Sequence, residues 1–217
     1  MGKKLLLIGG GGHCHSVIDS VLSSRIYTEI GLVAKDQDNY NELMDDTLIA
    51  PYLVGKDEDL PELYKRGWGS AFITLGSIGN TFGRRALFKT ISKIGFKIPT
   101  LIDPSAVVSG TAVMGNGIFI GKRAVVNAGV KLGTCTIINT GAIIEHDCIV
   151  GDFVHISPGT TICGQVSIGN DSHIGAGSVV RQMITIGSKS IIGAGSVVVK
   201  EIPDNVKAYG NPCRVVE

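Results

Sequence analysis

The sequence that decides the fold is GAIIEHDCIVGDFVHISPGTTICGQVSIGNDSHIG, residues 141–175, in which an aliphatic residue recurs at every sixth position. The same period runs unbroken through Ile102, Val108, Met114, Ile120, Val126, Leu132, Ile138, Ile144, Val150, Ile156, Ile162, Ile168, Ile174, Val180, Ile186, Ile192 and Val198. Helices repeat every 3.6 residues and ordinary strands every two, so neither explains a strict period of six. The period predicts short strands joined by equivalent turns and wound into a parallel solenoid, with three repeats in each eighteen-residue coil.

Small residues complete the pattern. The position two before each aliphatic residue often holds Ala, Ser, Thr or Cys, as at Ala142, Cys148 and Ser178. One large and one small inward side chain per repeat would fill a narrow prism. Gly, Asn, Asp and Lys follow in the turns, where a left-handed backbone costs glycine little.

The first 100 residues differ in composition from the rest, because they contain clusters of charged residues that the predicted solenoid lacks. We therefore expect two domains, 1–100 and 101–217. Apolar runs predict strands over 5–8, 30–33 and 71–75 and helices over 15–23 and 81–93. Alternating strands and helices indicate a small parallel, Rossmann-like α/β sheet. Ligands of such sheets bind beyond the carboxyl ends of the strands, so we expect 9–13, the stretch after Val33, and 76–80 to converge.

The overall charge, apolar runs and cysteine content argue against several classes of protein. A net charge of +1 gives no general field for nucleic acid or a membrane surface. The apolar run Leu5 to Ile8 is too short for a signal peptide or a membrane span, so we expect a cytoplasmic protein without membrane insertion. Five cysteines without a CxxC pair argue against a disulfide framework or a zinc knuckle.

A glycine turn, Gly9 to Gly12, lies between the first expected strand and helix. Such a turn brings backbone N–H groups and the positive end of a helix to an anion. The dinucleotide fingerprint is incomplete, because Cys14 stands where its third glycine would be. The alternative is a glycine turn that binds nothing.

Two motifs in this first part resemble a known family. The run Gly9-Gly10-Gly11-Gly12-His13-Cys14-His15-Ser16-Val17-Ile18-Asp19 resembles the GxGGHxxxVxD opening of the sialic-acid O-acetyltransferase-like family, and Gly76-Ser77-Ile78-Gly79-Asn80 with Arg84 resembles its IGN…R element. That family includes N-acetyltransferases of UDP-4-amino sugars used in bacterial glycan synthesis. The resemblance covers essentially the whole chain and implies that the solenoid is a left-handed β-helix.

The resemblance implies that the N-terminal domain binds a nucleotide-linked sugar. The residues that it assigns to this role are Gly11, Gly12, His13, Gly79, Asn80 and Arg84. Family members carry acidic residues after the second strand, whereas this chain has Ala34 and Lys35, with its first acid at Asp36. We include Lys35 and Asp36 in the expected site, where sugar or base recognition would differ from that of the family.

Acyl transfer needs a base for the nucleophile's proton and a donor for the developing oxyanion. His146 stands at a corner of one repeat between two carboxylates, Glu145 and Asp147, either of which could orient it. A solvent-exposed histidine without a role is the alternative. The resemblance implies that His146 is the general base. Gly164 lies one coil further on, where its N–H would suit an oxyanion donor, and we expect His155 to contact substrate or the acyl group.

The duplicated runs 174–180 and 192–198 form a wall of small residues that begins at Gly175 and Gly193. In the family such a wall accommodates the pantetheine arm of acetyl-CoA, and Lys200 belongs to a segment that resembles the closing coil near the CoA nucleotide. The alternative is that these glycines only form corners. We expect no metal, because the histidines are nine and eighteen residues apart and form no close pair.

These observations predict an acetyl-CoA-dependent N-acetyltransferase that acts on a nucleotide-linked 4-amino sugar by direct transfer. The alternatives are an O-acetyltransferase of sialic acid or a related sugar, and a noncatalytic nucleotide-sugar-binding scaffold. Outward apolar residues such as Val125, Ile137, Ile143 and Ile149 would leave apolar surface unless chains associate. The resemblance implies a homotrimer with active sites between chains. The nucleotide, the sugar and the choice between amine and hydroxyl acceptors stay open at this stage.

Overall fold

The computed structural model describes residues 3–34 and 52–216, which form two compact units. The first comprises Met1–Gly76 and Phe82–Leu101, and the second Ser77–Thr81 and Ile102–Glu217. The change from one unit to the other at Leu101 lies next to the expected boundary. The short segment 77–81, expected in the first domain, belongs to the second unit instead.

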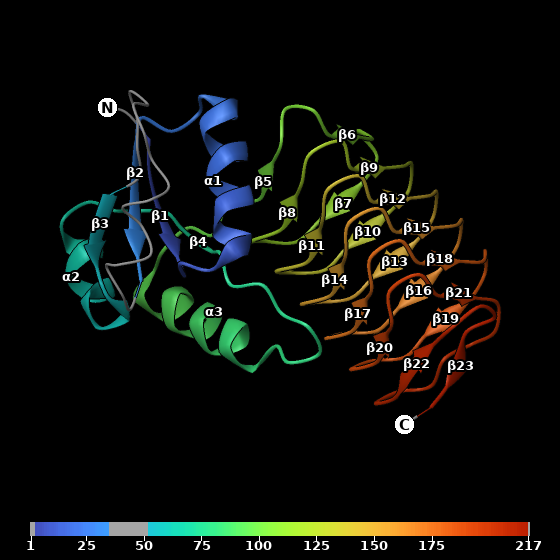
Figure 1. Ribbon diagram of the computed structural model, residues 1–217. Helices are drawn as coiled ribbons and strands as arrows, with labels where there is room; N and C mark the ends of the chain where they lie inside the picture. Colours follow the sequence, from blue (N-terminus) through green and yellow to red (C-terminus); the bar gives the residue numbers. More distant parts are fainter. Residues whose placement is uncertain (1–2, 35–51, 217) are drawn as a thin grey trace. The chain divides into compact units, whose positions relative to one another are not determined.

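The first unit is a parallel sheet with helices (Figure 1). Its strand order is β3-β2-β1-β4. The strands are β1 (Lys4–Ile8), β2 (Glu29–Val33), β3 (Tyr52–Gly55) and β4 (Ala71–Ile73), and the helices are α1 (Gly12–Ser24), η1 (Asp57–Asp59), α2 (Leu60–Lys65) and α3 (Phe82–Ile94). The predicted parallel α/β sheet is confirmed.

Local differences from the expected elements have local causes. Helix α1 begins at Gly12 rather than at His15, because Gly11 is already extended and Cys14 N–H bonds to its carbonyl. The strand expected over 71–75 ends at Ile73. Strand β3 and helix α2 were not predicted, since a partly exposed four-residue strand and a six-residue helix carry little periodic signal.

The second unit is a left-handed parallel β-helix of two-residue strands stacked in three sheets (Figure 1). The β13 sheet contains β7 (Val113–Met114), β10 (Lys131–Leu132), β13 (Ile149–Val150), β16 (Ser167–Ile168) and β19 (Thr185–Ile186). The β12 sheet contains β6 (Val107–Val108), β9 (Val125–Val126), β12 (Ile143–Ile144), β15 (Thr161–Ile162), β18 (Val179–Val180) and β21 (Val197–Val198). The β14 sheet contains β5 (Leu101–Ile102), β8 (Phe119–Ile120), β11 (Ile137–Ile138), β14 (His155–Ile156), β17 (His173–Ile174), β20 (Ile191–Ile192), β22 (Lys207–Tyr209) and β23 (Arg214–Val215).

Residues eighteen apart pair on successive coils up to β21, as the period predicts, and the closing coil pairs residues sixteen apart, such as Ile192 and Ala208. Ile138, Ile156, Ile174 and Ile192 form one such column, and all four are fully buried. Most strands point their first residue outward and their second inward. The period thus produces three continuous ladders around one aliphatic core.

Buried hydroxyl groups explain why Ser and Thr are tolerated at the small inward positions. Thr160 Oγ1 donates to Gly175 O (3.1 Å), and Ser178 Oγ donates to Gly193 O (3.0 Å). Each bond joins one coil to a corner carbonyl of the next. A buried polar group that is bonded in this way avoids the cost of an unsatisfied one.

Two expectations about the direction of apolar residues were wrong. Ile102 was expected to point inward, but it is 38% exposed because it opens the solenoid and no earlier coil covers it. Ile137 was expected to add to the apolar surface, but it is only 2% exposed. It lies in the β14 sheet, against which segment 77–81 packs. Ile149 matches the expectation, with 51% of its surface exposed.

The inward and outward positions of β18 provide a matched test of the core. Val180 is fully buried, whereas its neighbour Val179 is 38% exposed. We expect Val180→Ala to lower the free energy of unfolding by about 2 kcal/mol, because it removes two buried methyl groups and leaves a cavity. Val179→Ala should cost clearly less. Urea unfolding of both variants measures the difference, and equal losses would contradict the assigned facing of the strand.

Candidate active site

His146 lies at the corner that joins β12 to β13, formed by Glu145, His146, Asp147 and Cys148, here called the His146 corner. Its Nδ1 is 2.9 Å from Oδ2 of Asp147, and the two side chains are 58% and 59% exposed. The carboxylate accepts the Nδ1 proton, which leaves Nε2 as the basic nitrogen. Of the two flanking acids, Asp147 is the one for which the structure shows a hydrogen bond to the imidazole.

Gly164 stands one coil further on at the same corner, directly beneath the imidazole. A Cβ at this position would lie 2.6 Å from Nε2 of His146, so only glycine leaves the ring in place. The Gly164 carbonyl accepts from Met183 N, but its own N–H finds no acceptor among the described residues. A free backbone N–H therefore lies beside the basic nitrogen.

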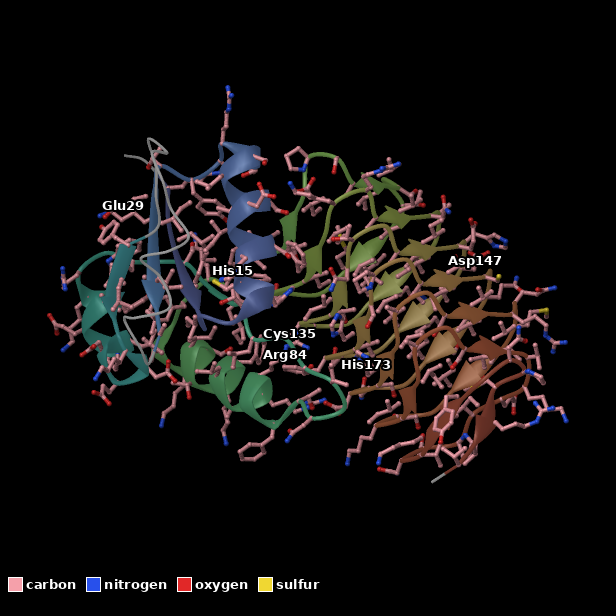
Figure 2. All side chains as sticks on the ribbon, viewed as in Figure 1. His15, Glu29, Arg84, Cys135, Asp147 and His173 are labelled. Atoms are coloured by element: carbon pink, nitrogen blue, oxygen red, sulfur yellow. The ribbon has the colours of Figure 1, made fainter. Side chains whose placement is uncertain are left out.

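His155 and His173 belong to the β14 sheet, and neither lies at the His146 corner. In a three-sided coil, the corner between the β12 and β13 sheets is opposite the β14 sheet. Figure 2 shows Asp147 and His173 on different sides of the β-helix. One chain therefore does not bring His155 to its own His146.

Segment 77–81 packs on the β14 sheet. His155 Nδ1 donates to Ser77 O (2.9 Å), while Asn139 Nδ2 donates to His155 Nε2 (3.2 Å), so His155 is held as the neutral Nδ1–H tautomer. Gly79 lies against Ile191, where a Cβ would collide with the isoleucine side chain. Thr81 Oγ1 donates to Asp171 Oδ1 (2.5 Å). Gly79 and Asn80, expected in the nucleotide-sugar site, therefore belong to the β-helix unit.

Two kinds of glycine occur in the small-residue wall. Gly175 and Gly193 are required by coil stacking, because a Cβ would lie 2.5 Å from Ala194 N or 2.7 Å from Tyr209 Cβ. A second set, here called the glycine column, is open, since a Cβ at any member would meet no atom within 4 Å. The column consists of Gly141, Gly159, Gly177 and Gly195.

All members of the glycine column have positive φ, but this does not explain their identity. Equivalent corners hold Asp147, Gln165 and Met183 at φ of 60° or 61°. The sequence therefore keeps a row of residues without side chains at this corner, although the backbone conformation does not require glycine. Lys200 is exposed just after β21, the last strand of the β12 sheet.

The first unit contains a cavity of about 660 Å³ at the carboxyl ends of its strands. Its walls come from the glycine turn, the ends of β1 and β2, and helices α2 and α3. The lining residues are Ile8, Gly9, Gly10, Gly11, Val33, Ala34, Asp57, Leu60, Leu75, Gly83, Ala86, Leu87 and Thr90. Its volume lies in the usual range for small-ligand sites.

The glycine turn is fixed at one end and open at the other. Gly9 has φ +112° and a Cβ there would collide with Leu75, while its carbonyl accepts from Thr74 Oγ1 at 2.6 Å. Gly11 and Gly12 are exposed, and a Cβ at either would meet nothing within 4 Å. A ligand can therefore approach the backbone at Gly11 and Gly12.

The other expected sugar-site residues lie outside the cavity wall. His13 is half-buried beside Gly76, and Arg84 is buried on α3. Lys35 and Asp36 lie outside the described residues. Gly9 to Gly11 and Ala34 line the cavity together, but none of residues 76–80 does, so the expected convergence of three segments is met only in part. Asp57, α2 and α3 were missed, because no pattern marked them as lining a site.

Comparison with known proteins connects both units to one family. Residues 4–91 match the PglD N-terminal domain, residues 147–182 the bacterial transferase hexapeptide (six repeats), and residues 165–200 the hexapeptide repeat of succinyl-transferase. The chain is 35% identical to the acetyltransferase domain of PglB from Neisseria gonorrhoeae, solved with acetyl coenzyme A, with a TM-score of 0.88 over 100% of both chains. The protein belongs to the hexapeptide-repeat acyltransferases.

Other solved structures agree with this assignment. The acyltransferase is 33% identical to a mutant of perosamine N-acetyltransferase from Caulobacter crescentus, solved with CoA and GDP-perosamine. That match has a TM-score of 0.87 and covers 99% of this chain and 97% of the other. WeeI from Acinetobacter baumannii, at 22% identity and a TM-score of 0.79, shares the fold, with 99% and 100% of the chains covered. Comparison with curated proteins finds no match.

Within residues 3–34 and 52–216, the acyltransferase shows no group of three or more His, Cys, Asp or Glu side chains that could hold a metal ion. Over the same ranges, none of its helices combines the length and the apolar character that crossing a membrane requires. Cys148 is buried and donates to Cys163 O (3.1 Å). Burial raises the pKa of its thiol to about 11, which disfavours a nucleophilic thiolate.

Gly164→Ala tests the packing of the His146 corner. We expect the new methyl group to displace the imidazole and shift its ¹⁵N resonances, with little change in melting temperature because the ring is exposed. Gly110→Ala is the matched control, since Gly110 occupies the same column two coils before His146 and a Cβ there meets nothing within 4 Å. Unmoved His146 resonances in Gly164→Ala would contradict the packing described.

His173 should make stability depend on pH. Burial lowers its pKa below the ordinary 6.5, although the Ser77 backbone opposes the shift. The unfolded chain therefore binds this proton more readily, so the stability contribution is present above pH 6.5 and is lost as the pH falls below it. We expect urea unfolding between pH 7.5 and 5 to show a smaller loss of stability in His173→Gln than in the wild type. Identical losses would show that His173 does not contribute.

Proposed function

We propose that this acyltransferase transfers an acetyl group from acetyl-CoA to the amine of a nucleotide-linked 4-amino sugar used in bacterial glycan biosynthesis. The observation that carries the proposal is the His146 corner, where an oriented imidazole lies beside the unbonded N–H of Gly164. Its relatives supply the substrate class, because one was solved with CoA and GDP-perosamine and another with acetyl coenzyme A.

In the proposed reaction, Nε2 of His146 accepts a proton from the sugar amine as the nitrogen attacks the thioester carbonyl. Asp147 holds Nδ1–H and stabilises the imidazolium that forms. The Gly164 N–H donates to the oxyanion of the tetrahedral intermediate. Its collapse breaks the C–S bond and releases CoA as the thiolate, which leaves an amide on the sugar. Transfer is direct, since the buried Cys148 is poorly suited to carry an acyl group.

The glycine column fits the extended arm of acetyl-CoA. A Cβ at any of its four glycines would meet no atom within 4 Å, and side chains are tolerated at the equivalent backbone positions elsewhere. The pantetheine would lie along this column. Lys200, which follows β21 at the other edge of the β12 sheet, would be available to the phosphates of CoA. Gly175 and Gly193 would let the coils stack closely and so form the small-residue wall beside the pantetheine.

The proposed active form is a homotrimer with sites between chains. Val113, Ile149 and Met183 are large exposed apolar side chains on the β13 sheet and at the His146 corner. A surface of this kind favours association. Active sites between the chains of this trimer are part of the same proposal.

The cavity of the first unit is the proposed nucleotide site. Gly11 and Gly12 would bind the diphosphate through backbone N–H groups, and the apolar walls would enclose the base. Among the described lining residues, the backbone N–H groups of the glycine turn are the proposed donors to the phosphates.

The deciding experiment is thiol release from acetyl-CoA with UDP-, dTDP- and GDP-linked 4-amino sugars and with free sialic acid. We expect turnover on an amino-sugar nucleotide, lowered about 10²–10⁴-fold in kcat by His146→Asn, the usual contribution of a general base. Gly110→Ala, at the same corner column but away from the imidazole, should keep wild-type turnover.

Other outcomes would change the proposal in defined ways. Turnover on sialic acid alone would assign O-acetylation. Full activity in His146→Asn would show that His146 is not the general base. Nucleotide-sugar binding without turnover on any acceptor would favour a noncatalytic scaffold.

A further inference from the structure

Asp57 is the only ionisable residue among the described residues that line the cavity of the first unit. It is the first residue of η1, just beyond the carboxyl end of β3, and it is exposed. Apart from Thr90, the rest of the lining consists of glycines and apolar residues. Among the described residues, Asp57 is therefore the one charged side chain that can recognise a polar ligand in this cavity.

An ionised carboxylate only accepts hydrogen bonds, so the ligand edge that faces it must donate. Guanine presents its N1–H and its N2 amino group side by side, which matches the two oxygens of a carboxylate. Uracil and thymine present a single N–H between two carbonyl oxygens, and those oxygens would face the carboxylate. Adenine presents its amino group beside a ring nitrogen that is itself an acceptor. The carboxylate therefore discriminates among the bases.

The strand order places Asp57 at a suitable distance from the glycine turn. The turn follows β1 and Asp57 follows β3, with β2 between them. Neighbouring strands are separated by about 4.7–4.9 Å, so two steps along the sheet edge cover about 10 Å. A nucleoside can bridge that gap, with its phosphate at the turn and its base at Asp57. The apolar residues between them, such as Val33 and Leu60, suit the faces of a base.

We infer that Asp57 selects guanine by accepting hydrogen bonds from N1–H and the N2 amino group, so that the acceptor sugar is carried on guanosine diphosphate. This inference rests on the proposed function, since it names the nucleotide of the same site. Asp57 is a specificity residue for binding and takes no part in the acetyl transfer.

Isothermal titration of the full chain with GDP, IDP, UDP and 2′-deoxy-GDP tests the inference. IDP lacks only the N2 amino group. We expect the wild type to bind GDP about 5- to 100-fold more tightly than IDP or UDP, the range for losing one bidentate base contact. Asp57→Asn should reduce the ratio of GDP to IDP affinity to about one. Glu58→Gln, which removes the same charge from a neighbour outside the cavity lining, should keep the wild-type ratio.

Three results would overturn the inference. These are equal affinity of the wild type for GDP and IDP, an unchanged ratio in Asp57→Asn, and a preference for GDP over 2′-deoxy-GDP that Asp57→Asn abolishes. The last would place Asp57 on the ribose. Melting curves of the variants confirm folding.

The nucleotide inference and the proposed function fail in different ways. A GDP preference that depends on Asp57, without acetyl transfer to any amino sugar, would contradict the proposed function and support the guanine inference. Acetyl transfer only to UDP-linked sugars would contradict the guanine inference but support the proposed function.

Discussion

The stacking register of the coils is the constraint on which the rest of the second unit depends. From β5 to β21 each coil contributes eighteen residues, so a residue in a strand pairs with its counterpart one coil away. The aliphatic columns are one result, and the pairing of Gly164 with His146 is another. A single inserted residue between these two would turn the coil and remove the N–H from beside the imidazole. Core packing and site geometry therefore share one periodic rule.

The sequence contained most of the information for this architecture. The period of six is enough to predict the strands, the columns and the relation between residues 146 and 164. Alternating elements and a glycine turn likewise predict the parallel sheet of the first unit. Handedness came only with the family resemblance, because spacing is the same in a coil of either hand.

Other features depend on tertiary contacts that spacing does not encode. The choice of Asp147 over Glu145 follows from the direction of each side chain at a corner. The packing of segment 77–81 depends on Ser77, Gly79 and Thr81 meeting His155, Ile191 and Asp171, which are far away in the sequence. His155, expected to contact substrate or the acyl group, bonds through its ring nitrogens to Ser77 and Asn139, and the spacing of the repeats encodes neither contact. The glycine column was visible only after open glycines were separated from those that stacking requires.

The membership of segment 77–81 in the β-helix unit changes what connects the two units. The chain passes from one unit to the other at residues 76–77, 81–82 and 101–102, so it crosses three times rather than once. A single-linker protein could be divided by cutting one bond or by ending a gene early. Here, residues 1–101 alone would carry a loop without its isoleucine and histidine neighbours, and residues 102–217 alone would expose the surface it covers. The two units are therefore inseparable as linear pieces, and recombination that exchanges the first unit must carry this loop and its β-helix partners together.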